Sequence, residues 1–476
     1  MVFSSLEFLF LFFPAMLAVY YIIPHKYLKW RNLALLITSL IFYGWGEPIY
    51  VFLMIFSITF DYIYGYGVSI NKAKGNDKLA RRFVIASMVT NILVLGFFKY
   101  ADFFINNLRL IPALSFLEPL NLALPIGISF YTFQTMSYTI DLYKGDAKLQ
   151  KNIVSFGAFV TLFPQLVAGP IVRYKHIDEQ LRKRDESVAL FASGTRTFLA
   201  GMGKKIFFAN IAGQMWEAVR DAPMDERTVI GCWIGLICYG FQIYFDFSGY
   251  SDMAIGTGKM LGFKFLENFN YPYISKSITE FWRRWHISLS SWFRDYVYFP
   301  LGGSRCAPLI NYRNLLIVWF LTGFWHGASW NFVFWGLYYF VLLVIEKAFL
   351  LKRLEKVPAF FQHIYTLFFV LFGWLLFVAE DLGGLGEGMV YLGNMFGIGV
   401  STTLSQMDIY NISRNFLFFV ILAIAATPLP KKLFYRFYEK SQLIKLAAYA
   451  GGAAILVFSV AYLVDSSYNP FLYFRF

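Results

Sequence analysis

Apolar stretches long enough to lie in a lipid bilayer recur along this chain, from its first ten residues to its last thirty. Hydrophobic residues make up 58% of the sequence and charged residues only 15%, so it is not a soluble enzyme with a single anchor. We therefore expect an all-α, polytopic membrane protein. It should form one domain over residues 1–476, with about 10–12 membrane segments.

The distribution of Lys and Arg predicts how the chain is oriented, because positive residues accumulate in short cytoplasmic loops. Such residues follow the first expected span, about 8–23. They also follow the third expected span, where they lie at positions 72–82, whereas the loop at 46–48 has none. This alternation places the N-terminus outside. The net charge of +13 then comes mostly from the loop residues that set the orientation of the chain. We expect anionic lipid or an anionic donor as the partner of these charges, and no nucleic acid.

Apolar runs predict the later spans at about 83–105, 122–143, 229–248, 313–324, 331–349, 363–379, 413–429 and 446–464. Segment 152–172 has basic loops at both ends and internal prolines, so we expect a re-entrant hairpin there. Segment 188–212 is amphipathic and should cross poorly or lie at the interface. Segment 262–312, rich in Arg and Trp, is too polar to cross and is the expected active-site segment.

One histidine lies where imidazole is costly: His326, inside the apolar run 315–327. An ionisable ring at membrane depth must be desolvated or must line a wet cavity, and both cost free energy. Such residues indicate function by default, because imidazole titrates near physiological pH and can carry protons. His326 is therefore the first candidate catalytic residue.

A second candidate is His286, in an aromatic and basic segment. If 281–297 forms one helix, His286 lies on its apolar side beside Trp282 and Phe293, while the charged residues Arg283, Arg284, Arg294 and Asp295 occupy the other side. A histidine facing inward among tryptophans is not placed for solubility. The alternative is a buried histidine satisfied by one backbone carbonyl.

Other polar groups in the spans are less specific. Asp246 and Asp252 could bind a cation or orient a histidine, although such residues more often satisfy helix ends and buried cations. The cysteines Cys232, Cys238 and Cys306 form no metal-ligand pattern, so we expect neither a metal site nor a bound cofactor. Two intramembrane histidines without redox or metal ligands predict removal of a proton from a hydroxyl, which makes the alcohol nucleophilic toward a thioester.

Five motifs occur in order: LPIGISFY at 124–131, FPQLVAGP at 163–170, FDFSGYSD at 245–252, FWRRWH at 281–286 and WHG at 325–327. Together they resemble the membrane-bound O-acyltransferase family, and in particular its bacterial branch of alginate O-acetylation proteins. The ending YNPFLYFRF at 468–476 is similar to that branch as well. The resemblance runs along nearly the whole chain.

The resemblance implies a ring of tilted transmembrane helices around a thinned central tunnel, in a bacterial cytoplasmic membrane. It implies that His326 is the catalytic residue, as general base or transient acyl carrier, and that His286 orients or polarises the thioester carbonyl. An acyl group, most simply acetyl, would pass from a cytoplasmic thioester (acetyl-CoA or an acylated carrier) to a hydroxyl of an exported, alginate-like polysaccharide. A separate extracytoplasmic acetyltransferase is the implied partner. The expected lining of the passage is Trp282, Trp285, Trp325 and Asn331.

Two alternatives remain open. One is D-alanyl transfer from a carrier protein to teichoic acid, as in other members of the same family. The second is a proton-coupled transporter or flippase with His326 on its proton path. Transporters usually carry inverted repeats with paired broken helices, and no such repeat is visible here.

Overall fold

The computed structural model describes residues 1–167, 169–465, 468–470 and 472. Its elements are helices, as expected, and within those residues the only β pairing is one parallel bridge between Thr228 and Thr402. The chain divides into two compact units, residues 1–199 with 250–266, and residues 200–249 with 267–476. The expectation of a single domain over 1–476 stays a prediction.

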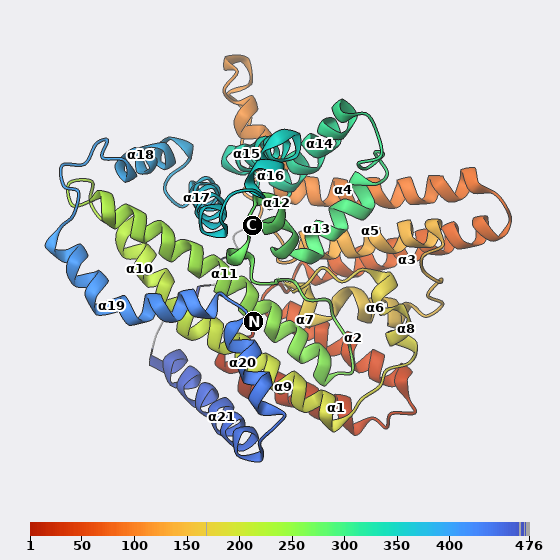
Figure 1. Ribbon diagram of the computed structural model, residues 1–476. Coiled ribbons are helices and arrows are strands. Elements are labelled where there is room, and N and C mark those ends of the chain that lie inside the picture. The colour runs from red at the N-terminus through yellow and green to blue at the C-terminus, as the bar shows by residue number, and fades with distance from the viewer. Residues whose placement is uncertain (168, 466–467, 471, 473–476) are drawn as a thin grey trace. The chain divides into compact units, whose positions relative to one another are not determined.

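Within its described residues, the first unit contains ten complete helical elements and most of α9 (Figure 1). The last part of α11 (Val229–Met260), from residue 250 on, also belongs to the first unit. In chain order the elements are η1 (Phe8–Phe12), α1 (Phe13–Ile22), α2 (Leu28–Gly44), α3 (Val51–Ala73), α4 (Asp77–Leu108), η2 (Pro112–Leu114), α5 (Ile128–Lys144), α6 (Ile153–Thr161), α7 (Phe163–Leu166), α8 (Tyr174–Arg182) and α9 (Val188–Gly203).

The second unit begins near the end of α9 and holds the remaining elements. They are η3 (Lys204–Ala209), α10 (Asn210–Arg220), α11 (Val229–Met260), η4 (Pro272–Ile274), α12 (Ile278–Arg284), α13 (Ile287–Phe293), η5 (Arg294–Tyr298), α14 (Pro308–His326), α15 (Trp330–Ile345), η6 (Glu346–Leu350), α16 (Leu351–Leu354), α17 (Ala359–Val378), α18 (Leu385–Met395), α19 (Gln406–Ala425), α20 (Leu429–Tyr438) and α21 (Gln442–Asp465).

Among the described residues, 7 helices are long and apolar enough to cross a membrane. This makes the chain a multi-pass membrane protein. They are α3, α4, α11, α15 with its extension to Leu354, α17, α19 and α21. In α19 only Leu422 is buried and in α21 only Ser459, so nearly the whole surface of both helices is free to face lipid.

Two expected segments differ from one continuous helix. The span expected over 122–143 forms a helix only from Ile128, because Pro125 and the left-handed backbone of Gly127 (φ +74°) precede it. In 152–172, α6 ends at Thr161, and the four-residue α7 then begins with Phe163 and Pro164. The expected break is present, while its depth in a membrane stays a prediction.

Two other segments are longer than expected. The amphipathic stretch expected over 188–212 lies in a helical run through α9, η3 and α10 to Arg220. The span expected over 229–248 becomes α11, which continues to Met260 and includes the whole FDFSGYSD motif. Asp246 on α11 pairs with Lys205 at 2.8 Å, and both side chains are 3% exposed. Asp246 therefore neutralises a buried cation.

A buried polar cluster joins α3, α4 and α5, which lie side by side in Figure 1. The carboxylate of Asp61 accepts hydrogen bonds from the Ser87 hydroxyl at 2.5 Å and from the Asn91 amide at 2.8 and 3.1 Å. Thr135 on α5 donates to the Asn91 carbonyl oxygen at 3.0 Å. Because a buried carboxylate is costly unless hydrogen-bonded, this network specifies how the three helices meet.

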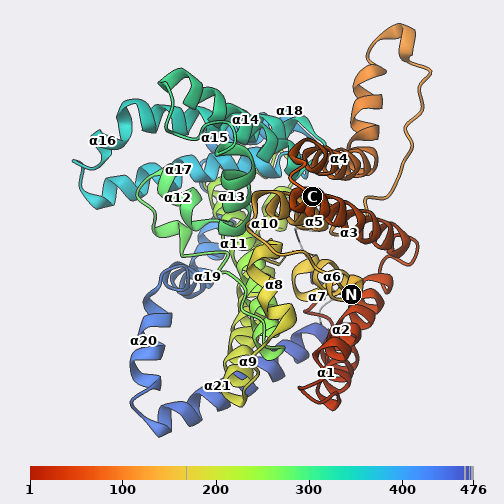
Figure 2. The same cartoon turned by 90° about the vertical axis from the view of Figure 1, so that its right-hand side faces the viewer.

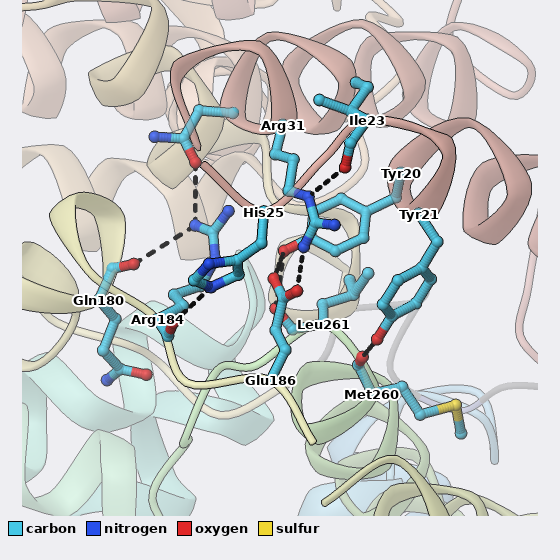
Figure 3. Close-up of polar contacts among 11 residues, drawn as sticks. Tyr20, Tyr21, Ile23, His25, Arg31, Gln180, Arg184, Glu186, Met260 and Leu261 are labelled. Carbon is cyan, nitrogen blue, oxygen red and sulfur yellow. Dashed lines mark hydrogen bonds and ion pairs between the residues drawn. The ribbon is translucent and has the colours of Figure 1, made fainter. Parts of the chain in front are cut away.

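A second network in the first unit holds Arg184, which lies in the basic loop that follows segment 152–172 (Figure 3). Its guanidinium donates to the Asn32 side-chain oxygen at 2.9 Å and stacks over the Phe263 ring at 4.3 Å, and Arg184 is 2% exposed. Beside it, Arg31 forms an ion pair with Glu186, which also accepts from the Tyr20 hydroxyl. Arg184 is thus a packing residue and not a solvated loop charge.

Helices α14 and α15 approach closely through two glycines. A Cβ on Gly336 would lie 2.4 Å from the backbone oxygen of Trp319, and one on Gly323 would lie 2.3 Å from that of Phe332. Small residues at such crossings let helix backbones meet inside a membrane. This contact positions the end of α14, where His326 lies.

We expect Gly336→Ala to lower stability by about 1–3 kcal/mol, because the added methyl group must push α14 and α15 apart. Thermal unfolding in detergent measures the effect. Gly451→Ala on α21 is the matched control, since a Cβ there meets nothing within 4 Å. Equal melting temperatures for both variants would contradict the close crossing.

Candidate active site

His326 is the last residue of α14 and is 5% exposed. The helix ends there because Gly327 adopts an extended backbone, and any side chain at Gly327 would collide with the Phe332 ring, 2.1 Å from a built Cβ. Three aromatic rings surround the imidazole, with ring centres at 5.0 Å (Trp325), 5.0 Å (Trp335) and 5.2 Å (Phe377). The apolar run therefore fixes the ring by packing.

His286 does not lie on a continuous helix, and the expectation of one helix over 281–297 is wrong. α12 ends at Arg284, and α13 begins only at Ile287. His286 between them has left-handed backbone angles (φ 45°, ψ 55°) and is 1% exposed. Such a conformation in a non-glycine residue costs about 1–3 kcal/mol and persists where the surroundings impose it, often at functional sites.

Asn268 orients the His286 ring. Its side-chain oxygen accepts from the backbone N–H of Ser288 at 3.2 Å and from the Ser288 hydroxyl at 2.8 Å, which identifies this atom as the oxygen. The same oxygen lies 3.1 Å from Nδ1 of His286, so Nδ1 carries a proton and donates. In the neutral ring the lone pair is then on Nε2.

Both histidines line one cavity of about 220 Å³. α12, α13 and α14 supply most of its wall. Of the four residues predicted to line the passage, Trp282 and Trp285 line this cavity. The remaining lining is Thr279, Arg283, Leu289, Ser290, Phe293, Arg294, Tyr298, Leu315, Val318, Trp319, Thr322 and Leu343.

The other two predicted residues, Trp325 and Asn331, are not among the lining residues of this cavity. Trp325 contacts both candidate rings, with ring centres 5.0 Å from His326 and 6.4 Å from His286. Asn331 is the second residue of α15 and donates its amide to the backbone oxygens of Leu376 and Phe377 at 3.4 and 3.2 Å. Asn331 thereby holds α15 against the end of α17, where Phe377 packs on His326.

The helix break also changes the electrostatics expected from the sequence. Arg283 and Arg294 were expected on the polar face opposite His286, but both line the cavity with it. The Arg283 side chain is exposed and makes no hydrogen bond or ion pair within the described residues, whereas Arg294 pairs with Asp295 at 2.8 Å. The cavity therefore has a positive rim, which favours an anionic ligand or a developing oxyanion.

Two functional features escaped sequence reasoning. Asn268 lies in a segment without regular periodicity, 18 residues before the histidine that it orients. Arg283 was assigned to the wrong side because nothing in the local pattern, which reads as a good amphipathic helix, signals the break at Trp285 and His286.

Within the described residues no group of three His, Cys, Asp or Glu side chains could hold a metal ion, and the three cysteines are free.

We expect Asn268→Ala to reduce turnover by about 100-fold, because a misplaced catalytic group costs about that much. The ring would lose the contact that fixes its tautomer and orientation. Thioester turnover by purified protein measures the effect. Asn268→Asp keeps an acceptor oxygen and should retain more activity than the alanine variant. Equal losses would show that the contact supports the fold only.

Comparison with known proteins places this geometry in a family. The sequence model of MBOAT, the membrane-bound O-acyltransferase family, matches residues 150–385, which include both histidines. A probable alginate O-acetylase AlgI of Azotobacter vinelandii is 39% identical over 100% of both chains. A peptidoglycan O-acetyltransferase of Helicobacter pylori is 32% identical over 100% of this chain and 98% of its own.

More distantly, a teichoic acid D-alanyltransferase of Streptococcus thermophilus is 30% identical over 48% of this chain and 58% of its own. All the motifs on which the sequence resemblance rested lie within the match to the alginate O-acetylase, which covers 100% of this chain. Ala168 and most of the ending 468–476 fall outside the described residues. The full-length relatives carry the assignment: this chain belongs to the membrane-bound O-acyltransferase family.

Proposed function

We propose that this enzyme moves an acetyl group from a cytoplasmic thioester across the membrane for O-acetylation of an exported polysaccharide. The observation that carries the proposal is the convergence of His326 and His286 on one cavity with a positive rim. The names of the full-length relatives, an alginate O-acetylase and a peptidoglycan O-acetyltransferase, support acetyl as the acyl group and a polysaccharide as the acceptor.

In the proposed chemistry, His326 accepts the proton of the acceptor hydroxyl as its oxygen attacks the thioester carbonyl. The new C–O bond forms, the C–S bond breaks, and the proton passes to the departing thiolate. The surrounding rings of Trp325, Trp335 and Phe377 restrict water near the base, which strengthens the electrostatic interactions of the reaction.

The Asn268 contact limits what His286 can do. Since Nδ1 donates to Asn268, the neutral ring presents a lone pair at Nε2 and no N–H. His286 can therefore polarise the thioester carbonyl only as an imidazolium, and when neutral it accepts a proton. Arg283 on the rim, which carries its charge at every relevant pH, would favour the carbonyl oxygen as negative charge develops there.

The donor is acetyl-CoA or an acylated carrier, the enzyme holds no cofactor of its own, and a separate extracytoplasmic acetyltransferase completes transfer to the polysaccharide. We place the enzyme in a bacterial cytoplasmic membrane with its N-terminus outside, which the alternation of basic loops supports. D-alanyl transfer is the second candidate. Its relative matches 48% of this chain, against 100% for the acetylating relatives.

Release of free thiol from acetyl-CoA by the purified protein tests the proposal. We expect thiol release together with acetylation of a hydroxyl acceptor or of water. A transporter would move its substrate without breaking the thioester bond, so retained transport with no thiol release would contradict the enzyme. Turnover of a D-alanyl carrier in place of the acetyl donor would select the second candidate.

A further inference from the structure

The chain forms a basic groove, of which only one wall lies within the region 150–385 matched by the family model. Helix α20 provides one wall with Lys431, Lys432, Tyr435 and Arg436, and Asn270 and Tyr271 provide the other. The groove encloses about 560 Å³ and is open to its surroundings. In Figure 2, α20 connects α19 to α21. The groove is distinct from the histidine cavity, with which it shares no lining residue.

The groove carries excess positive charge. Lys431 pairs with Glu267 at 3.5 Å, and the one carboxylate among the lining residues is Glu439. The side chains of Lys432 and Arg436 make no hydrogen bond or ion pair within the described residues. Two cations that share one concave surface without a partner attract an oligoanion.

The amphipathicity of α20 explains why the groove remains open. At 100° per residue, Leu429, Leu433, Phe434 and Phe437 occupy one half of the helix, and all four side chains are exposed. The basic residues occupy the other half, which lines the groove. A helix of this kind lies in the membrane interface with its apolar face toward lipid. Its basic face is therefore held at the membrane surface and turned toward Asn270 and Tyr271.

The opposite wall of the groove is connected to the histidine cavity. The Asn270 N–H donates to the backbone oxygen of Arg284 at 2.9 Å, and the Arg284 guanidinium donates back to the Asn270 oxygen at 3.0 Å. Two residues earlier, Asn268 contacts Nδ1 of His286 at 3.1 Å. A ligand in the groove thus touches the same short segment that orients a cavity histidine.

We propose that this groove binds the phosphate groups of a nucleotide-linked acyl thioester, a donor of the coenzyme A type, and so selects the donor of the reaction proposed above. Its volume falls in the range of small-molecule sites, about 300–1,000 Å³. A carrier protein would need roughly 800 Å² of matching surface on each partner. Tyr271 and Tyr435 are among the lining residues, and aromatic side chains are the kind on which a nucleotide base stacks.

Direct binding tests the groove independently of catalysis. The probe is adenosine 3′,5′-bisphosphate, titrated by calorimetry into the full chain in nanodiscs of neutral phosphatidylcholine. We expect the double variant Lys432→Gln, Arg436→Gln to raise Kd by at least about tenfold, since losing charged hydrogen bonds has at least that effect. Lys440→Gln, a basic residue near the end of α20 outside the lining, is the matched control and should leave Kd unchanged. Equal Kd values for the double variant and the wild type overturn the proposal.

Kinetics identifies the source of the phosphate. The double variant should raise KM for acetyl-CoA about tenfold and leave kcat and the KM for acetyl-pantetheine, which lacks the nucleotide, unchanged. Equal increases for both donors, or an effect seen only with anionic lipid in the nanodisc, overturn the assignment to the donor. Turnover of an acylated carrier but not of acetyl-CoA also overturns the assignment to the donor. If wild-type protein binds the bisphosphate through Lys432 and Arg436 but breaks no thioester, the proposed function fails and the groove stands.

Discussion

Replacing His326 with alanine should lower thioester turnover by about 10²–10⁴-fold, the usual contribution of a positioned general base. The imidazole is the group at the end of α14 that both lines the cavity and can accept a proton. Its three aromatic neighbours contain no basic group that could replace it. The effect should fall on kcat, because the proton moves only as the reaction proceeds.

The matched control is His363→Ala. His363 also lies on a membrane helix, where its Nδ1 contacts the backbone oxygen of Ser275 at 3.0 Å, but it is not among the cavity residues. We expect this variant to keep most of the wild-type activity. Thiol release should be measured for both variants at matched melting temperatures, so that a folding defect is separated from lost chemistry. A His326→Ala enzyme with wild-type kcat would remove His326 from the mechanism.

Replacing Asp246 with asparagine should destabilise the protein by about 3–5 kcal/mol, because a buried cation would remain without its counter-charge. Lys205 and Asp246 lie 2.8 Å apart, and each side chain is 3% exposed. The same pair holds the end of the chain, since Lys205 donates to the Pro470 oxygen and Asp246 accepts from the Leu472 N–H at 3.0 Å. Thermal unfolding in detergent measures the loss.

Neutralising both partners should recover most of that stability, since no uncompensated charge then remains. The double variant Lys205→Met, Asp246→Asn therefore distinguishes a charge effect from lost packing. Asp221→Asn is the matched control, because Asp221 pairs with Arg220 at 2.7 Å but its side chain is 64% exposed. Such a pair contributes at most about 1 kcal/mol. A double variant less stable than Asp246→Asn would contradict the ion-pair account.

The long apolar helices were predictable because each needs only hydropathy and length. α4, α17, α19 and α21 formed where apolar runs indicated them, with boundaries shifted by several residues. The break after Thr161 was also predictable, since Pro164 signals it locally. By contrast, the continuation of the helical run of α9 and η3 through α10 to Arg220 was not predicted beyond residue 212.

The candidate site shows the same limit at the level of single residues. His326 and His286 could be found because imidazole is rare and costly in an apolar segment. The break in the helix at His286 could not be predicted, since residues 281–297 have a good helical period and include neither glycine nor proline. Asn268 and the rim position of Arg283 both depend on that break. Their roles required the folded backbone.

Following the acetyl group and the thiol separately across a sealed membrane tests the central claim most directly. Purified protein is reconstituted in vesicles, and acetyl-labelled CoA is added outside with a hydroxyl acceptor trapped in the lumen. The account predicts acetyl label inside the vesicles, as acetylated acceptor or acetate, with an equal amount of free thiol outside, and neither product with His326→Ala. Intact thioester inside the vesicles, or acetyl label that remains wholly outside with the thiol, would contradict it.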